Sequence, residues 1–319
     1  MLVKLRGDII TGARMAQEEL AKGSDSRCVV GMDLGGSGIK LGLFAADGSC
    51  VRDMTVATPQ PATPEAVLAA MVEAIARLDP SNQSEAIGIG TPGPVDATGR
   101  IAKIAINLKG WHNVPLADWL EAKTGKPTVL ANDANCAGMG EAWLGAGRGC
   151  RNFIMLTLGT GVGGAIILDG KLFVGHNGAA GELGLITLNL YGPECNSGNR
   201  GSLEQYVSVQ AIRRQTGGME PDHLAHMAQA GNRQAHEFWE SYGHHLGAGL
   251  ASLIYVLSPE VVAIGGGISA SADLFLPAAI AEVERRVLPE CRSGLQIIPA
   301  QLGGKAGTVG AAKLAYSLI

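Results

Sequence analysis

The stretch Asp33-Leu-Gly-Gly-Ser-Gly-Ile-Lys40 places three glycines directly after a short apolar run. The apolar run predicts a β-strand over 28–33, and the residues after the glycine turn predict a returning strand over 39–44. Asp47-Gly48 is a hairpin signal, and 49–57 supplies a third strand. Residues 28–57 therefore have the order strand, glycine turn, strand, Asp-Gly turn and strand.

The same pattern occurs again in the middle of the chain. Residues 153–158 predict a strand that ends at Leu158-Gly-Thr-Gly-Val-Gly-Gly164, and 162–168 predict the returning strand. Asp169-Gly170 is again a hairpin signal, and 171–174 complete the unit. Two similar halves can face one another across a cleft, so the repeat predicts a duplicated α/β fold.

The remaining elements follow from the periodicity of apolar residues. Helices are predicted at 8–22, 64–78, 116–123, 134–144, 233–257, about 273–287 and from about 306 onward. Strands are predicted at 86–90, 128–131, 261–264 and 295–298. The first half therefore has the order βββαβα. A second unit with the same order of elements is predicted to begin with the strand at 128–131.

Composition limits the class of protein. The chain has 319 residues, 25 Lys+Arg against 29 Asp+Glu, a formal net charge of −4 and 46% hydrophobic residues. That length fits two domains of about 150 residues each, and the small net charge lacks the basic footprint of a nucleic-acid binder. Glycine is the outlier at 46 residues, roughly twice its average usage. Such an excess indicates many turns and close backbone approaches, as in α/β enzymes that handle phosphates.

Cysteines and apolar segments indicate the compartment. The six cysteines are scattered with no Cys-x-x-Cys pair, which favours reduced thiols in a cytoplasmic protein. Residues 1–27 lack the uninterrupted apolar stretch of a secretory signal. The longest apolar segment, 246–264, is interrupted by serine, proline and glutamate, so neither a membrane span nor a membrane partner is expected.

The two glycine turns are candidate phosphate-binding loops. Backbone N–H groups at Gly35 and Gly36 can approach a phosphate without an intervening Cβ, and Ser37 can donate a hydrogen bond. Asp33, at the strand end, can hold Mg²⁺ or its water shell. One such turn is equally well explained as an ordinary glycine-rich hairpin. The equivalent turn at Gly159-Thr160-Gly161 suggests a phosphate chain that is held from both sides.

A third glycine turn and an Asn-Asp pair complete the candidate chemistry. Gly265-Gly266-Gly267 ends a strand before a helix, where bare backbone can lie against an adenosine face; close strand–helix packing is the alternative. Asp133 lies between a strand end and a helix start, where ligands bind in open α/β sheets. It can accept a hydroxyl proton while that oxygen attacks a γ-phosphoryl group. The alternative is a plain helix N-cap, which Asn132 and Asp133 also favour.

Six segments, in order from about residue 28 to the end, carry a family pattern. They are Asp33 to Lys40, 88–94 (Gly-Ile-Gly-Thr-Pro-Gly-Pro), 132–135 (Asn-Asp-Ala-Asn), 158–164, 178–184 (Gly-Ala-Ala-Gly-Glu-Leu-Gly) and 263–267 (Ala-Ile-Gly-Gly-Gly). Together they resemble the ROK family, which comprises repressors, uncharacterised reading frames and sugar kinases. The resemblance implies ATP-dependent phosphorylation of a hexose or hexose derivative, typically at its primary hydroxyl, as in a glucokinase.

The resemblance also implies a fold, an actin-like or hexokinase-type two-domain α/β fold that binds ATP and sugar in the interdomain cleft. Residues 1–27 are then an N-terminal helical extension, 28–131 a small α/β domain and 132–304 a large α/β domain. The C-terminal helix, about 305–319, is expected to pack back on the small domain. Family members are often dimers or tetramers, so a homo-oligomer is expected.

Position by position, the resemblance implies roles for individual residues. Asp133 matches the general base of the family. The expected sugar-binding residues are Gly93, Asn107, Asn132, Glu182 and Glu204. The residues expected to bind ATP and Mg²⁺ are Asp33, Gly35, Gly36, Ser37, Lys40, Gly159, Thr160, Gly161, Gly265, Gly266 and Gly267. The two glutamates fit chemically, because a carboxylate accepts paired hydrogen bonds from adjacent sugar hydroxyls.

One motif departs from the family pattern. Family kinases usually have a His after Glu-x-Gly and a Cys-x-Cys-Gly-x-x-Gly-Cys stretch, and these residues bind a structural zinc. Here Leu185 replaces the His, and Ser197 and Ser202 replace two cysteines, so that only Cys195 remains. Because Leu has no donor atom and neutral hydroxyls are poor Zn²⁺ ligands, we predict that the site holds no zinc. The missing His also removes a sugar contact.

The alternative function is a sugar-sensing ROK protein or transcriptional regulator with little or no kinase activity. ROK repressors carry an N-terminal winged helix-turn-helix domain, whereas about 27 residues without a basic excess precede the first phosphate turn here. We therefore expect a small-molecule sugar as partner and no nucleic acid. The lost zinc ligands favour an impaired sensor, while Asp133 and both phosphate turns favour the kinase.

Overall fold

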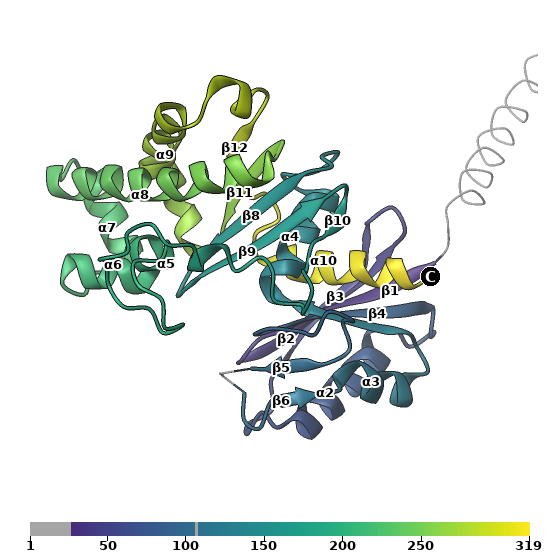
Figure 1. Ribbon diagram of the computed structural model, residues 1–319. Helices are drawn as coiled ribbons and strands as arrows, with labels where there is room; N and C mark the ends of the chain where they lie inside the picture. Colours follow the sequence, from purple (N-terminus) through teal and green to yellow (C-terminus); the bar gives the residue numbers. More distant parts are fainter. Residues whose placement is uncertain (1–26, 106–107) are drawn as a thin grey trace, which may run out of the picture.

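The computed structural model describes residues 27–105 and 108–319, which form two five-stranded sheets (Figure 1). The first sheet has the strand order β3-β2-β1-β4-β7. Its strands are β1 (Cys28–Leu34), β2 (Gly38–Ala45), β3 (Cys50–Ala57), β4 (Ser84–Thr91) and β7 (Thr128–Asn132). β1 pairs antiparallel with β2 and parallel with β4, which pairs parallel with β7. The carboxyl ends of β1, β4 and β7 therefore lie at one edge of the sheet.

Two helices, α2 (Pro64–Leu78) and α3 (Leu116–Thr124), pack on one face of this sheet. Thr63 caps α2 by accepting a hydrogen bond from the Ala66 N–H, and Pro64 occupies the first turn, where its missing N–H is not needed. The apolar stripe of α2 is buried in the core of the first sheet. Local capping and helical spacing thus account for this layer.

The second sheet has the strand order β10-β9-β8-β11-β12. Its strands are β8 (Phe153–Leu158), β9 (Val162–Leu168), β10 (Lys171–Leu172), β11 (Val261–Gly265) and β12 (Gln296–Pro299). β8 pairs antiparallel with β9 and parallel with β11, as β1 pairs with β2 and β4. The duplication predicted from the repeated turn pattern is confirmed.

The largest core lies between the second sheet and a group of helices. These helices are α5 (Glu204–Val207), α6 (Val209–Thr216), α7 (Pro221–Gln229), α8 (Arg233–Leu257) and α9 (Ala272–Arg286). β8 contributes Ile154, Leu156 and Leu158 to this core, because alternate side chains of a strand face the same side. The buried Tyr242 hydroxyl donates to the carbonyl of Val207 at 2.8 Å, so it is not left without a partner.

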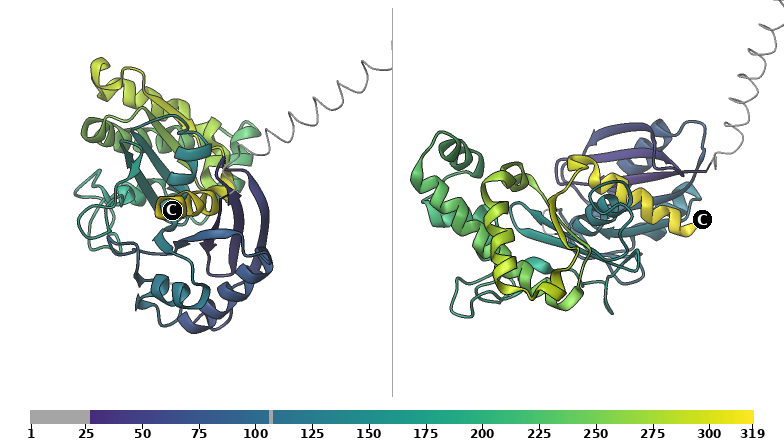
Figure 2. Two further views of the ribbon diagram at one scale, coloured as in Figure 1. Left: turned by 90° about the vertical axis from the view of Figure 1, so that its right-hand side faces the viewer. Right: turned by 90° about the horizontal axis from the view of Figure 1, so that it is seen from above.

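Two further helices, α4 (Asp133–Leu144) and α10 (Ala306–Ala315), lie between the sheets and pack against each other (Figure 2). Glycines let their backbones touch. A Cβ on Gly310 of α10 would lie 1.6 Å from the carbonyl oxygen of Cys136 in α4. A Cβ on Gly88 of β4 would lie 1.8 Å from a carbonyl oxygen of α10. α10 is therefore in direct backbone contact with both α4 and the first sheet.

Glu141, in the last turns of α4, adds a polar connection between these helices. Its side chain is fully buried. The carboxylate accepts hydrogen bonds from the Ala146 N–H at 2.8 Å, the Gln301 N–H at 2.9 Å and the Leu302 N–H at 2.6 Å. Three backbone donors thereby find a charged acceptor, so the chain that enters α10 is held against the end of α4.

Most of the predicted helices and strands are confirmed to within a few residues, but one assignment is wrong. β7 pairs with β4 in the first sheet, so the second repeat unit does not begin at 128–131. The second unit begins at β8. The reason is that the residues of a strand specify its extended shape and its buried faces, whereas its partner is chosen by the fold.

The structure also contains a short hairpin, β5 (Ala102–Ile104) and β6 (His112–Val114), that was not predicted. Strands of three residues are too short to show a period. The predicted helix 8–22 lies outside the described residues, and the domain bounds at 28–131 and 132–304 stay predictions. Among the helices of the described part, none is both long and apolar enough to cross a membrane.

We expect Gly310→Ala to destabilise the protein, although alanine is the better helix former by about 1 kcal/mol. The added Cβ would overlap the Cys136 carbonyl and force α4 and α10 apart, at a cost of about 2 kcal/mol in the free energy of unfolding. Urea denaturation measures this. Gly36→Ala is the matched control, because a Cβ there meets nothing within 4 Å. If Gly310→Ala is as stable as that control, the backbone contact does not constrain the helices.

Candidate active site

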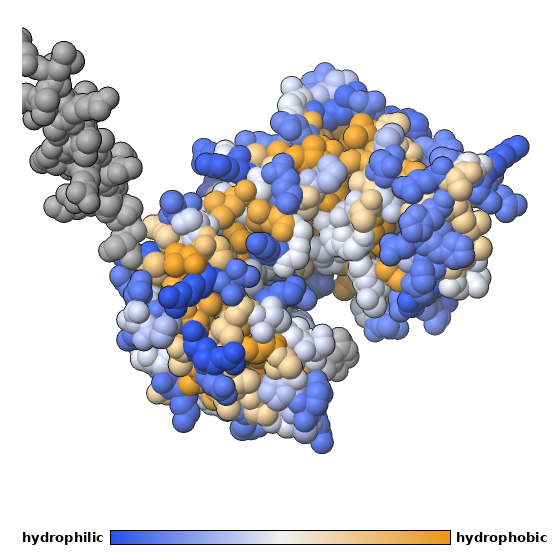
Figure 3. Space-filling model, turned by 180° about the vertical axis from the view of Figure 1, so that it is seen from behind, coloured by the Kyte–Doolittle hydropathy of each residue, from blue (hydrophilic) through white to orange (hydrophobic). Residues whose placement is uncertain are grey.

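A cavity of about 530 Å³ lies between the two sheets, in the recess that separates the two lobes (Figure 3). Its wall comes from both halves of the fold: the end of β1, the β7–α4 junction, the β8–β9 turn, the segment 178–182 and the start of α10. This volume is typical of small-molecule sites. The position also fits, because ligands of open α/β sheets bind at the carboxyl ends of the strands.

The β7–α4 junction places Asn132 and Asp133 in the cavity. Asn132 is the N-cap of α4, since its Oδ1 accepts hydrogen bonds from the Ala134 N–H at 2.9 Å and the Asn135 N–H at 3.2 Å. Asp133 Oδ1 accepts from the Ala134 N–H at 2.8 Å, and the carboxylate is open to the cavity. Because Asn132 is the N-cap of α4, helix capping does not explain why an aspartate stands at position 133.

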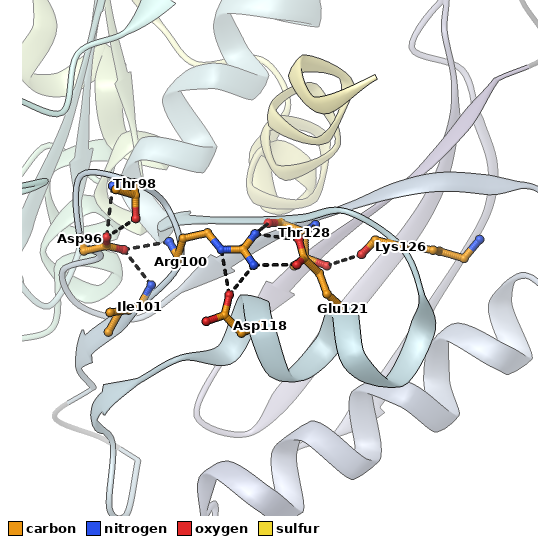
Figure 4. A network of polar contacts seen from close by, with 8 residues as sticks. All are labelled: Asp96, Thr98, Arg100, Ile101, Asp118, Glu121, Lys126 and Thr128. Carbon is orange, nitrogen blue, oxygen red and sulfur yellow. Dashed lines mark hydrogen bonds and ion pairs between the residues drawn. The ribbon is translucent and has the colours of Figure 1, made fainter.

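Arg100 anchors the other end of the strand that carries these residues (Figure 4). Its guanidinium group is hydrogen-bonded to Asp118 and Glu121 of α3, and it donates to the carbonyl of Thr128 at 3.0 Å. Glu121 also accepts a hydrogen bond from the Thr128 N–H at 2.8 Å. The hydrogen bonds from Arg100 lower the pKa of Glu121, so the pair stays ionised. β7 therefore starts at a fixed point and ends at Asn132, directly before Asp133.

Carboxylates are concentrated in the cavity. Burial is the main cause of the raised pKa of Asp133, and the charge of Asp33 raises that pKa further. Burial, followed by the charges of Asp133 and Glu204, raises the pKa of Glu182. Burial also raises the pKa of Asp33, against the opposing charge of Lys40, whose Nζ lies 3.7 Å from Asp33 Oδ2. Raised pKa values of this kind are typical of acid–base groups in active sites.

The second glycine turn, Gly159-Thr160-Gly161, lines the cavity and is connected to Glu204. Glu204 Oε2 accepts a hydrogen bond from the Val162 N–H at 2.8 Å, and a Cβ on Gly161 would lie 2.6 Å from that oxygen. The carbonyl of Gly159 accepts from the Val209 N–H at 2.8 Å. The turn is thus held in place from the side of α5 and α6, with its glycine backbone at the cavity.

The first glycine turn, residues 35–37, does not line the cavity, although Asp33 and Lys40 on either side of it do. Thr58 holds this turn: its Oγ1 donates to the carbonyl of Gly35 at 2.7 Å, and its N–H donates to the carbonyl of residue 37 at 3.1 Å. The nucleotide-binding roles of Gly35, Gly36 and Ser37 stay predictions.

Only one glycine of the third turn borders the cavity. Gly266 lines it, whereas Gly265 and Gly267 do not. Gly266 has φ +85° and a Cβ on it would lie 2.2 Å from the carbonyl oxygen of Leu158 in β8. Close packing against β8 therefore requires glycine here, and an additional contact with a nucleotide stays a prediction.

A fourth glycine-rich segment, Gly303-Gly304-Lys305-Ala306-Gly307, was not predicted to belong to the site. Four of its five residues line the cavity. Lys40 Nζ donates to the carbonyl of Gly304 at 3.3 Å, and a Cβ on Gly307 would lie 3.1 Å from Asp33 Cγ. The segment leads into α10, so the positive end of that helix lies at the cavity. The signal in the sequence was three glycines at the start of a predicted helix.

Some of the predicted sugar-binding residues line the cavity and others do not. Glu182 and Glu204 line the cavity together with Asn132. Gly93 does not line it, but its carbonyl accepts a hydrogen bond from Asn132 Nδ2 at 3.4 Å. Asn107 lies outside the described residues. The sugar-binding roles of all five residues stay predictions.

The residues at the family's zinc position do not fit that metal. Leu185 has no donor atom, and Cys195 Sγ accepts a hydrogen bond from Ser197 Oγ at 3.3 Å. Tetrahedral zinc sites use thiolate, imidazole or carboxylate ligands. Within residues 27–105 and 108–319, no three His, Cys, Asp or Glu side chains are grouped so that they could hold a metal ion.

Comparison with known proteins places the chain in a family. Residues 29–317 match the model of the ROK family. The chain is 34% identical over 305 residues to the glucokinase of Thermotoga maritima, covering 90% of this chain and 96% of that protein.

Solved structures agree with this match. The ROK hexokinase from Thermus thermophilus has a TM-score of 0.82 at 34% identity, covering 91% of this chain and 98% of the other. A ROK family glucokinase from Streptomyces griseus in complex with glucose and AMPPNP has a TM-score of 0.74 at 35% identity, covering 91% and 99%. These matches confirm the predicted hexokinase-type two-domain α/β fold. The chain belongs to the ROK family.

Proposed function

We infer that this protein is an ATP-dependent hexose kinase of the glucokinase type. The observation that carries this function is the position of Asp133, whose carboxylate shares one cavity with the glycine turn 159–161 and with Glu182 and Glu204. Phosphoryl transfer to a sugar needs a phosphate-binding side, a hydroxyl-binding side and a base that orients the attacking oxygen. The glucokinase relatives and the structural match to a glucose–AMPPNP complex support the same function.

On the acceptor side, Glu182, Glu204 and Asn132 bind the sugar. Carboxylate oxygens accept paired hydrogen bonds from neighbouring hydroxyls, and the amide of Asn132 donates as well as accepts. Glu204 is itself held by the Val162 N–H, so one of its oxygens is already oriented. These contacts direct the reacting hydroxyl toward Asp133, and such positioning supplies a large part of the rate enhancement.

Asp133 is the general base. It accepts the hydroxyl proton while the sugar oxygen forms a bond to the γ-phosphorus of ATP, and the bond to the departing oxygen of ADP breaks. Burial and the charge of Asp33 raise the pKa of Asp133, which makes its carboxylate a stronger base than a solvated aspartate. The oxygen of Asp133 that is bonded to the Ala134 N–H is fixed in orientation.

On the donor side, backbone N–H groups of 159–161 and of 303–307 bind phosphate oxygens, and Lys40 adds a positive charge. Asp33 fits Mg²⁺, because this ion prefers carboxylate oxygen and water as ligands. When bound, Mg²⁺ neutralises phosphate charge. Asp33 and Lys40 lie side by side at the cavity wall, which places opposite charges where a metal–phosphate group would bind.

Release of ADP from Mg-ATP, measured with a panel of hexoses, amino sugars and N-acetyl sugars, tests this function. We expect turnover with glucose-like hexoses, and Asp133→Asn should reduce it at least ~10²-fold while the sugar KM changes little. Inorganic polyphosphate is the second donor in the panel, since the backbone N–H groups and the Lys40 ammonium proposed for the donor side would bind phosphate oxygens.

Two outcomes would count against this assignment. Equal turnover by Asp133→Asn and wild type would remove Asp133 from the role of base. Sugar binding by the wild type without phosphorylation would favour the alternative, a sugar-sensing regulator, whose binding to DNA can be measured by gel shift at physiological salt.

Asp133→Asn should also stabilise the ligand-free protein at neutral pH. The pKa of Asp133 is higher in the folded than in the unfolded state, so the ionised carboxylate destabilises the fold at pH values above the folded pKa. Below the unfolded pKa both states bind the proton and this penalty is absent. The melting temperatures of the variant and the wild type should therefore differ at neutral pH and converge below about pH 4. A difference that is absent at neutral pH would show that burial of this charge costs nothing.

We propose that the fold needs no zinc. Elemental analysis of the purified protein should find no stoichiometric zinc, and a strong chelator should leave the melting temperature of the ligand-free protein unchanged. One zinc per chain, or a chelator-dependent drop in melting temperature, would contradict this. The homo-oligomeric state, the cytoplasmic location and the absence of a nucleic-acid partner also stay predictions.

A further inference from the structure

The segment 185–204 connects the two carboxylates on the acceptor side. It begins three residues after Glu182, at the last residue of η1 (Leu183–Leu185), and it ends at Glu204, the first residue of α5. Apart from that turn and two isolated bridges, Thr187 with Ser202 and Glu194 with Arg200, it has no regular structure. The positions of both carboxylates therefore depend on what holds this segment in shape.

The side chain of Asn199 joins the two ends of the segment. Its Nδ2 donates to the carbonyl of Leu185 at 2.9 Å and lies 3.0 Å from Thr187 Oγ1. Its Oδ1 accepts from the Arg200 N–H at 2.7 Å and lies 3.3 Å from Thr187 Oγ1. The backbone carbonyl of Asn199 accepts from the Cys195 N–H at 2.8 Å. One half-buried amide thus uses both its donor and its acceptor group.

These contacts continue to the residues that bear the carboxylates. The Leu185 N–H donates to the carbonyl of Glu182 at 3.0 Å, so the residue held by Asn199 is part of the turn that follows Glu182. At the other end, the Leu203 N–H donates to the carbonyl of Ile186 at 2.8 Å, and Leu203 is fully buried next to Glu204. A change at Asn199 would therefore act on the spacing of the two carboxylates.

The side chains of Cys195, Ser197, Glu194 and Arg200 do not make the same connection. Cys195 and Ser197 contact each other at 3.3 Å, but they are two residues apart and tie together only one end of the segment. Arg200 and Glu194 form an exposed ion pair at 2.6 Å, which contributes little to stability. Leu185 can take part only through its backbone carbonyl, and that carbonyl is the group that Asn199 binds.

We propose that Asn199 is a positioning residue, which holds Glu182 and Glu204 at the spacing that sugar binding requires. Its hydrogen bonds hold the segment 185–204 in shape. A metal ion would have the same effect if Leu185, Ser197 and Ser202 were metal ligands. The proposal rests on the proposed kinase function as far as the sugar is concerned. The existence of the hydrogen-bonded connection is independent of that function.

Asn199→Asp is the sharpest variant, because the carboxylate keeps the size of Asn and an acceptor oxygen at Oδ1 but cannot donate to the carbonyl of Leu185. We expect Asn199→Asp and Asn199→Ala to raise the sugar KM roughly tenfold, with the ATP KM and kcat within about twofold of wild type. Asn189→Ala is the matched control: it lies in the same segment, and within the described residues its side chain accepts from the nearby Tyr191 N–H and makes no hydrogen bond to the other end of the segment.

Hydrogen exchange of the ligand-free protein separates this proposal from the kinase function. In Asn199→Asp the amides of Leu188 and Leu203, which are hydrogen-bonded across the segment, should exchange faster, while Asn189→Ala and chelator-treated wild type should match untreated wild type. Unchanged exchange in Asn199→Asp overturns the connection. Faster exchange with an unchanged sugar KM overturns the positioning role. A wild type without kinase activity refutes the proposed function and leaves the exchange result as the test of the connection.

Discussion

The direct backbone contact between α4 and α10 is the constraint on which the site depends. Both helices begin at the cavity: α4 starts with Asp133, and α10 starts in the glycine segment beside Asp33 and Lys40. Glycines bring the two backbones together at Gly140 and Gly310, where an added Cβ would overlap a carbonyl oxygen of the other helix. The candidate base and the candidate phosphate-binding segment are therefore held at a fixed distance by the main chain, and Glu141 reinforces this at the other end of α4.

Three carboxylates of the cavity have raised pKa values. Burial raises the pKa values of Asp33, Asp133 and Glu182, and the like charges raise them further for Asp133 and Glu182. Lys40 opposes this effect at Asp33. A fold tolerates such a cluster when the surrounding elements are held rigidly, as β7 is by Arg100 and the β8–β9 turn is by Glu204.

The segment 185–204 shows how one loop shape can be kept by different interactions. A metal ion gathers several ligands at one point and binds them strongly, whereas an amide gathers fewer partners through weaker, directional hydrogen bonds. Asn199 contacts Leu185 at its backbone carbonyl and Cys195 at its backbone N–H, two of the four positions at which family members bind a metal. Leucine is acceptable at position 185 for this reason.

The sequence by itself determined the elements and much of the site, because turn preferences, helix caps and hydrophobic periods act between neighbours in the chain. The glycine turn at 159–161, the junction at Asn132 and Asp133, and the duplicated plan could all be predicted in this way. The tertiary structure alone decided that the glycine segment 303–307 completes the cavity beside Asp33, that β7 joins β4, and that Asn199 reaches Leu185. Each of these depends on which distant segments contact each other. The residue pattern of a single segment does not specify the segment that it contacts.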